Sequence, residues 1–173
     1  MMKRLFCALI LTVLLFAFAG CRENGSTANG GLDIAYYADL GSVPESDVKL
    51  GDGVPKETEE DGTYFFIEDG KNSYFSSGDF MYFYDPDAKE TKVYAIAALS
   101  KFFGFEIGAV SIEVTDTLTA AGIKYTERAA SEKDVFFLPS GDFTVVECKN
   151  LKNNLVFVFE ENSLCAALLS QIQ

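Results

Sequence analysis

The sequence predicts an α+β fold in which two tandem units, each a short helix followed by an antiparallel meander, form one sheet of about eight strands with the helices on one face. Three observations predict it. Aromatic and β-branched segments alternate with Gly, Asp, Asn and Pro turns. Helix-start signals run into glycines, and the same order of elements occurs twice, in residues 41–99 and 108–169.

The first residues have the organisation of an export signal. Two basic residues precede an apolar run from Leu5 to Ala19, which ends at Gly20 and Cys21. A basic start, an apolar middle and a small-residue cleavage site are typical of a signal peptide. The run is shorter than the roughly 20 residues that a permanent membrane span needs. We therefore expect residues 1–20 to be removed.

The cleavage site carries a more specific signal. Phe18-Ala19-Gly20-Cys21 resembles the lipobox of bacterial lipoproteins, with Phe18 in place of the usual leucine. The resemblance implies that the Cys21 thiol receives a diacylglycerol and becomes the first residue of the mature chain. Two or more acyl chains give stable anchoring. The implied location is the extracytoplasmic side of the bacterial cell membrane, or the outer membrane if the source has one.

Cys21 and the next ten residues form the expected tether. Residues 22–31 contain no apolar side chain larger than alanine and cannot form a core. Such a spacer covers about 17 Å on average and at most about 35 Å. We expect the folded part to follow as a first repeat, residues 32–100, and a second repeat, residues 101–173.

Composition excludes several classes of function. Removing the leader leaves 12 basic and 26 acidic residues, a net charge of −14, which disfavours nucleic acid as a partner. The chain has no histidine, the commonest catalytic side chain. Glu147 and Glu160 fall on adjacent predicted strands without any mark of a cleft, and the acidic run 56–61 is typical of a solvated loop rather than a metal site. We expect no enzyme activity, no metal and no cofactor.

In the first unit, the segment Ser42–Val48 predicts a helix with Pro44 in its first turn, ending at Gly51 or Gly53. The predicted strands follow at 63–67, 72–76, 80–84 and 93–98. The alanines of the last segment also suit a helix. The analogy with the second unit favours a strand.

In the second unit, Ser111 is the expected N-cap of a helix that ends at Gly122. Val114, Leu118 and Ala121 share one face of it. Strands are predicted at 134–138, 143–149, 155–160 and 164–169. Local similarity at an offset of 71 residues, 64–67 with 135–138 and 94–97 with 165–168, supports the repeat.

A dense group of tyrosines gives the candidate binding face: Tyr64, Tyr74, Tyr82 and Tyr84. In strand alternation Tyr82 and Tyr84 share one side, and Met81 and Phe83 take the other. If Met81 and Phe83 enter the core, the tyrosines form a contact surface on the open side. The alternative is that these rings only complete a half-exposed sheet.

Two cysteines remain for the folded part, Cys148 and Cys165. Export permits a disulfide between them. The predicted strand order separates them by two strands, about 9–10 Å, which exceeds the reach of a bridge. This spacing favours free thiols.

The segment from Phe105 to Val114, ending at Ala121-Gly122-Ile123, looks like a recurring entry motif of small extracytoplasmic bacterial domains. The overall plan resembles the β-lactamase-inhibitor-protein-like fold and its outer-membrane-assembly lipoprotein relatives. That resemblance implies a non-enzymatic module that binds another extracytoplasmic protein through an open sheet face. The alternative function is a binder of a small ligand or cell-wall fragment in a pocket between the two repeats.

Overall fold

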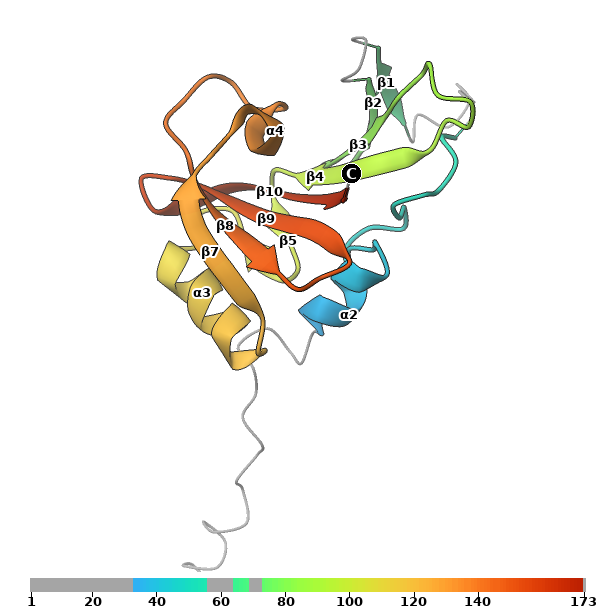
Figure 1. The fold of residues 1–173 in the computed structure, drawn as a ribbon. Coiled ribbons are helices and arrows are strands. Elements are labelled where there is room, and N and C mark those ends of the chain that lie inside the picture. Colours follow the sequence, from blue (N-terminus) through green and yellow to red (C-terminus); the bar gives the residue numbers. More distant parts are fainter. Residues whose placement is uncertain (1–32, 56–63, 69–72, 173) are drawn as a thin grey trace, which may run out of the picture. The chain divides into compact units, whose positions relative to one another are not determined.

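A computed structural model describes residues 33–55, 64–68 and 73–172. Residues 32–173 form one compact unit. The expected signal peptide, Cys21 and the expected tether lie outside the described residues. Within them the fold is α+β, with an eight-stranded antiparallel sheet in the order β1-β2-β3-β4-β10-β9-β8-β7, which agrees with the predicted class and strand number (Figure 1). No helix in these ranges is long and apolar enough to cross a membrane.

The elements fall into two similar series. One helix, α2, precedes β1–β4, and a second, α3, precedes β7–β10, with β4 and β10 paired antiparallel at the centre of the sheet. The bounds are α2 Ile34–Asp39, β1 Phe65–Ile67, β2 Tyr74–Ser77, β3 Phe80–Tyr84, β4 Val93–Ala98, β5 Lys101–Phe102, β6 Phe105–Glu106, α3 Ser111–Ala120, β7 Lys124–Ala129, α4 Glu132–Val135, β8 Thr144–Lys149, β9 Asn153–Glu160 and β10 Ser163–Gln171.

The first helix begins earlier than predicted. Asp33 caps α2 by accepting the backbone N–H of Tyr36 at 3.0 Å. Gly41, with φ of +70°, ends it, because the Gly41 and Ser42 N–H groups return to the carbonyls of Ala38 and Tyr37. The predicted helix at Ser42–Val48 is wrong, since this segment forms turns after the helix has ended.

The helix predicted in the second unit is present as α3. Its N-cap is Val110 rather than Ser111, and no side chain caps it. Gly122, with φ of +72°, ends the helix as predicted. The N–H groups of Gly122 and Ile123 bond the carbonyls of Thr119 and Leu118, the same closure as in α2.

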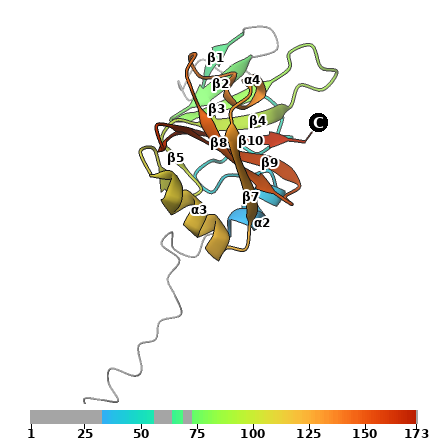
Figure 2. The ribbon, with the colours of Figure 1, turned by 60° about the vertical axis from the view of Figure 1, so that its left-hand side comes forward.

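Helices cover both faces of the sheet, which differs from the predicted arrangement (Figures 1 and 2). The α2/α3 face carries the main core, in which Ile34 and Leu118 of the helices meet large strand residues such as Phe157. On the opposite face, here called the α4 face, Phe136 packs with Phe83 and Leu168, and Val135 packs with Val158.

The strand predicted at 134–138 is wrong. Its first residues form α4, which opens with a capping box: Ser131 and Asp134 exchange side-chain and backbone hydrogen bonds. The strand that takes its place in this series is β7, Lys124–Ala129, which comes before α4; the sequence did not predict it because most of its side chains are polar. The strands predicted at 80–84 and 93–98 have the predicted bounds, so the alanine-rich segment is a strand.

Candidate functional site

The α4 face is hollowed into a groove of about 1260 Å³. One wall is α4, and the other is the connection between β3 and β4. Strands β8, β9, β10 and β4 provide the floor. The lining residues used below are Asp85, Glu90, Lys92, Tyr94, Glu132, Lys133, Phe136, Glu147, Lys149, Asn154, Leu168 and Ser170.

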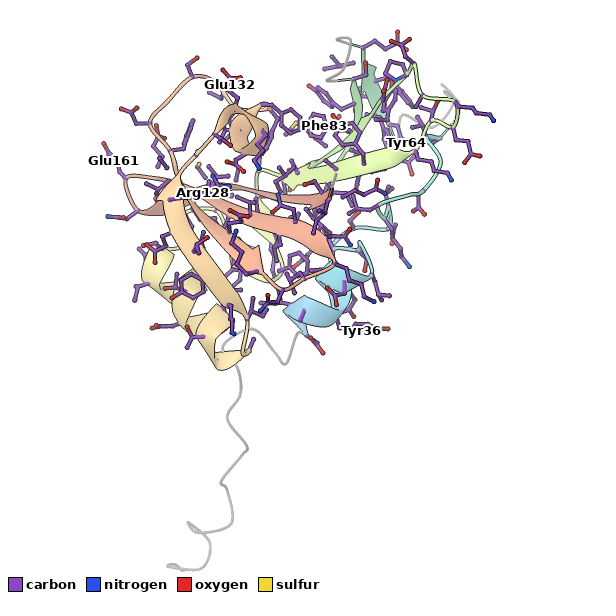
Figure 3. The ribbon with its side chains drawn as sticks, viewed as in Figure 1. Tyr36, Tyr64, Phe83, Arg128, Glu132 and Glu161 are labelled. Carbon is purple, nitrogen blue, oxygen red and sulfur yellow. The ribbon has the colours of Figure 1, made fainter. Side chains whose placement is uncertain are left out.

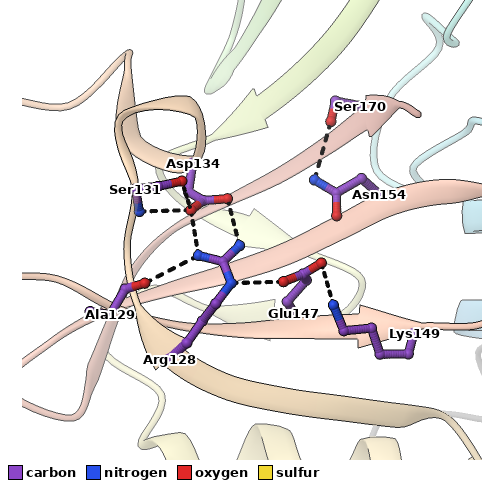
Figure 4. Close-up of polar contacts among 8 residues, drawn as sticks. All are labelled: Arg128, Ala129, Ser131, Asp134, Glu147, Lys149, Asn154 and Ser170. Carbon is purple, nitrogen blue, oxygen red and sulfur yellow. Dashed lines mark hydrogen bonds and ion pairs between the residues drawn. The ribbon is translucent and has the colours of Figure 1, made fainter. Parts of the chain in front are cut away.

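Strand register places two polar side chains among the apolar ones on the floor of the groove. Ser170 of β10 lies opposite Asn154 of β9 and Ala95 of β4. The Asn154 amide donates to the Ser170 hydroxyl at 3.5 Å (Figure 4). The next residues along these strands, Leu155 and Leu169, point to the α2/α3 core, since alternate side chains take opposite faces. Amide and hydroxyl groups therefore face the groove.

Tyr94 reaches the groove through an irregularity in β4. The pairing of β3 with β4 shifts between Phe83 and Tyr84, so that Tyr94 and Ala95 occupy the space of a single partner. Tyr94 and Ala95 consequently both lie on the α4 face, whereas Val93 points into the α2/α3 core. Burial, with a smaller effect from the charge of Asp85, raises the pKa of Tyr94, so its hydroxyl stays protonated.

A chain of four charged residues supports the α4 wall (Figure 4). Arg128 of β7 donates to both carboxylate oxygens of Asp134, at 2.7 and 3.0 Å, and through Nε to Glu147 at 2.7 Å. The Lys149 ammonium lies 2.5 Å from the other oxygen of Glu147. Bidentate pairing fixes both distance and orientation. It ties α4 to β7 and β8.

The charges of this network are stable near neutral pH. Burial alone would raise the pKa of Asp134, but hydrogen bonds from Arg128 and Ser131 outweigh it and lower the pKa to about 2. Hydrogen bonds from Lys149 and Arg128 also lower the pKa of Glu147. Neither carboxyl group is poised to donate or accept a proton at pH 7, which is unlike a general acid or base. The network is a structural support for the groove.

Aromatic contacts fix α4 from its other side. The ring of Phe83 meets that of Phe136 at 4.8 Å, edge to face, and that of Phe137 at 6.0 Å. Figure 3 shows Phe83 on the side of its strand toward α4. The α4 wall is thus held by β3 of the first series and by β7 and β8 of the second, so the groove exists before any partner binds.

The tyrosine face predicted from the sequence is wrong. Tyr82 and Tyr84 are 3% and 4% exposed and lie in the α2/α3 core, whereas Phe83 and Met81 are on the α4 face. The alternation was right and the choice of side was inverted. Tyr64 packs beside Phe75 at the α2/α3 core.

Tyr74 is the remaining predicted site residue. It lies on the α4 face, half-buried, with its ring 5.3 Å from that of Phe83. The structure therefore does not bring the four tyrosines together, because Tyr74 is separated from the other three by the sheet.

The two cysteines lie on opposite faces of the sheet as free thiols, Cys148 in the α2/α3 core and Cys165 on the α4 face. Burial raises the pKa of Cys148 to about 12 and also raises that of Cys165. A thiol reacts through its thiolate, so neither is an activated nucleophile.

The other candidates are also separated. Glu147 lies opposite Val156, whereas Glu160 is at the far, exposed end of β9. Within the described ranges no three His, Cys, Asp or Glu side chains converge to hold a metal ion. The acidic run 56–61 lies outside those ranges.

The groove residues were not found from the sequence, although one signal was present. Ser131-x-x-Asp134 is a helix-start signature and marks the wall. Asn154, Ser170 and Tyr94 carry no comparable motif, since only strand register gathers them. Comparisons of the chain with protein-family models, with curated proteins and with solved structures find no match.

Proposed function

We propose that the chain is a bacterial lipoprotein, anchored outside the cytoplasm through Cys21, that acts as a non-enzymatic protein-binding or scaffold module. The groove on the α4 face is its binding site. The observation that carries this proposal is that the groove is wide, is lined by both polar and apolar side chains, and has an α4 wall fixed by ion pairs and aromatic contacts.

The size and lining of the groove favour a segment of polypeptide as the bound group. Its volume of about 1260 Å³ lies above the roughly 300–1,000 Å³ of typical small-molecule pockets. Its lining combines amide, tyrosine, ammonium and carboxylate groups with apolar side chains such as Phe136 and Leu168, which matches the backbone groups and apolar side chains of a peptide. Tyrosine is also enriched in protein interfaces.

We further propose that residues 32–100 and 101–173 are two copies of one unit. Each helix precedes four strands and ends at a glycine with the same two hydrogen bonds. The units would meet through β4 and β10. This plan is the one that the resemblance to the β-lactamase-inhibitor-protein-like fold implies; members of that group whose role is known bind other proteins, and some use an open sheet face to do so.

A blocking variant tests the groove. Ser170→Arg places a long cationic side chain on the floor and should abolish retention of a protein partner from solubilised membranes without changing the midpoint of unfolding. Ala120→Arg, on the exposed surface of α3, makes the same charge change away from the groove and should bind as the wild type does. Equal retention of the partner by both variants would show that the groove does not bind it.

A substitution at Cys21 tests the proposed lipid anchor. Cys21→Ser removes the acyl acceptor and should release the chain from membranes, because the acyl chains supply the anchoring free energy. Circular dichroism should be unchanged, since the folded unit begins after the spacer. Retention of the serine variant in the membrane fraction would overturn the lipid anchor.

A small ligand or cell-wall fragment is the second candidate for the groove. One observation favours it: the lining comes from both series of elements, Asp85 to Ala95 and Glu132 to Ile172. A soluble fragment at a hundred times its dissociation constant should stabilise the fold by about 2.7 kcal/mol. A thermal-shift series with peptidoglycan fragments separates the two, because a groove specific for protein gives no shift.

A further inference from the structure

We propose that the outer side of α2, centred on Tyr36 and Leu40, rests on the surface of the bilayer that carries the Cys21 anchor. The inference depends on the lipid anchor of the proposed function and adds an orientation to it. The folded unit would be held with α2 toward the lipid and the groove turned away from it.

Helix α2 is apolar on both of its sides. Ile34 and Ala38 are buried against the sheet. Tyr36 and Leu40, four residues apart and hence on one side, are 57% and 53% exposed. Figure 3 shows Tyr36 on the outer side of the helix. A surface helix in water normally presents polar residues there.

The charges around α2 are mixed, with two lysines beside the acidic residues. Both acidic residues at the helix accept backbone hydrogen bonds, Asp33 from Tyr36 at 3.0 Å and Asp39 from Lys152 at 2.7 Å. Lys152 is exposed beside the helix. Tyrosine and lysine are side chains that place an apolar body in the membrane interface and keep a polar tip in water.

A second lysine lies close to the end of α2. The N–H of Leu50 bonds the Gly41 carbonyl at 2.8 Å, which brings the exposed Lys49 next to the helix end. In an acidic chain these two lysines lessen repulsion from anionic headgroups at the place where Leu40 is exposed.

The chain between the anchor and α2 is short. Asp33 follows Cys21 by 12 residues, which reach at most about 40 Å. The anchor supplies the membrane affinity, so the α2 contact is intramolecular and a small apolar surface suffices to set the orientation. Apart from one end at Asn153, whose amide bonds the Ala38 carbonyl of α2, the groove lies on the opposite face of the sheet from α2, so in this orientation most of it faces away from the bilayer.

The absence of tryptophan from the sequence permits a direct test. Tyr36→Trp places one fluorophore on α2. Phe65→Trp places one at a 69% exposed position of β1, whose register puts it on the α4 face. Each full-length lipidated variant is incorporated into phosphatidylethanolamine–phosphatidylglycerol vesicles, with and without brominated acyl chains. The tryptophan at position 36 should emit at shorter wavelength and lose most of its emission to bromine, while the tryptophan at position 65 should do neither.

The possible outcomes distinguish a wrong orientation of the folded unit from the absence of a lipid anchor. Adding Leu40→Ser to Tyr36→Trp should reduce the bromine quenching while the protein still floats with the vesicles. An unquenched fluorophore at position 36 in floating protein, or equal quenching at both positions, overturns the orientation and leaves the anchor intact. A shift to shorter wavelength without quenching means that a protein covers α2, which also overturns it. Failure of the wild type to float refutes the anchor and the orientation together.

Discussion

Tyr82 joins the sheet to the turns that follow α2. Its hydroxyl lies 2.9 Å from that of Ser46, and its ring stacks on Phe75 at 4.9 Å. Burial raises the pKa of Tyr82, with the Ser46 hydrogen bond acting in the opposite direction. A polar tip is therefore retained inside the core because it has a partner there.

The two functions of this side chain can be separated by substitution. Tyr82→Phe keeps the ring and should lower the free energy of unfolding by about 1 kcal/mol, the net value of one hydrogen bond. Tyr82→Ala leaves a cavity and should lower it by about 3–5 kcal/mol. Urea denaturation measures both. An alanine variant as stable as the wild type would indicate that Tyr82 lies on the surface.

Asp134 gives the fold a dependence on pH. Its folded pKa of about 2 is below its ordinary value of 3.8, so its stabilisation is complete above about pH 5 and is lost as pH falls through 3.8 toward 2. Asp134→Asn should cost up to about 2 kcal/mol at pH 7 and much less near pH 2. Urea midpoints of both proteins between pH 2 and 7 check it. A constant difference over that range would contradict the assignment.

At the scale of elements, the glycines that end the helices carry the strongest local constraint. Gly41 and Gly122 both have positive φ, but their surroundings differ. A Cβ at Gly41 would lie 2.9 Å from that of Leu50, whereas a Cβ at Gly122 meets nothing within 4 Å. The helix ends therefore share a conformation and differ in packing.

This difference in packing predicts that alanine substitutions at the two glycines lower the free energy of unfolding by unequal amounts. Gly122→Ala should cost about 1–2 kcal/mol, from backbone strain alone. Gly41→Ala should cost more, because Leu50 must also move. Denaturant midpoints of the two variants measure the two losses of stability. A smaller loss for Gly41→Ala would mean that the turn containing Leu50 moves at little energetic cost.

Element prediction succeeded where chain periodicity and tertiary packing agreed. The strands at 80–84 and 93–98 are rich in apolar side chains that reach the core, and the helix ending at Gly122 buries Val114 and Leu118 at the predicted spacing. It failed where the signal was polar. The edge strand β7 has exposed side chains such as Lys124 and Glu127, and the Ser131–Asp134 capping box overrides the β-propensity of Val135 and the residues after it.

At the scale of the whole molecule, the sequence supports the class of fold and the number of strands but not the choice of faces. Both sides of β3 are aromatic, so alternation alone does not say whether Tyr82 or Phe83 enters the main core. The groove has the same origin. Asn154 and Ser170 are 16 residues apart, and only the pairing of β9 with β10 brings them together.

The central claim is that the groove, rather than another surface, meets a protein partner. A photo-reactive phenylalanine analogue at position 94 replaces the aromatic ring that lines the groove, and the same analogue at position 36 replaces an exposed tyrosine on the opposite face. Both lipidated proteins are irradiated in intact cells. The account predicts a protein adduct from position 94 and none from position 36. A protein adduct from position 36 alone, or from neither position, would contradict it.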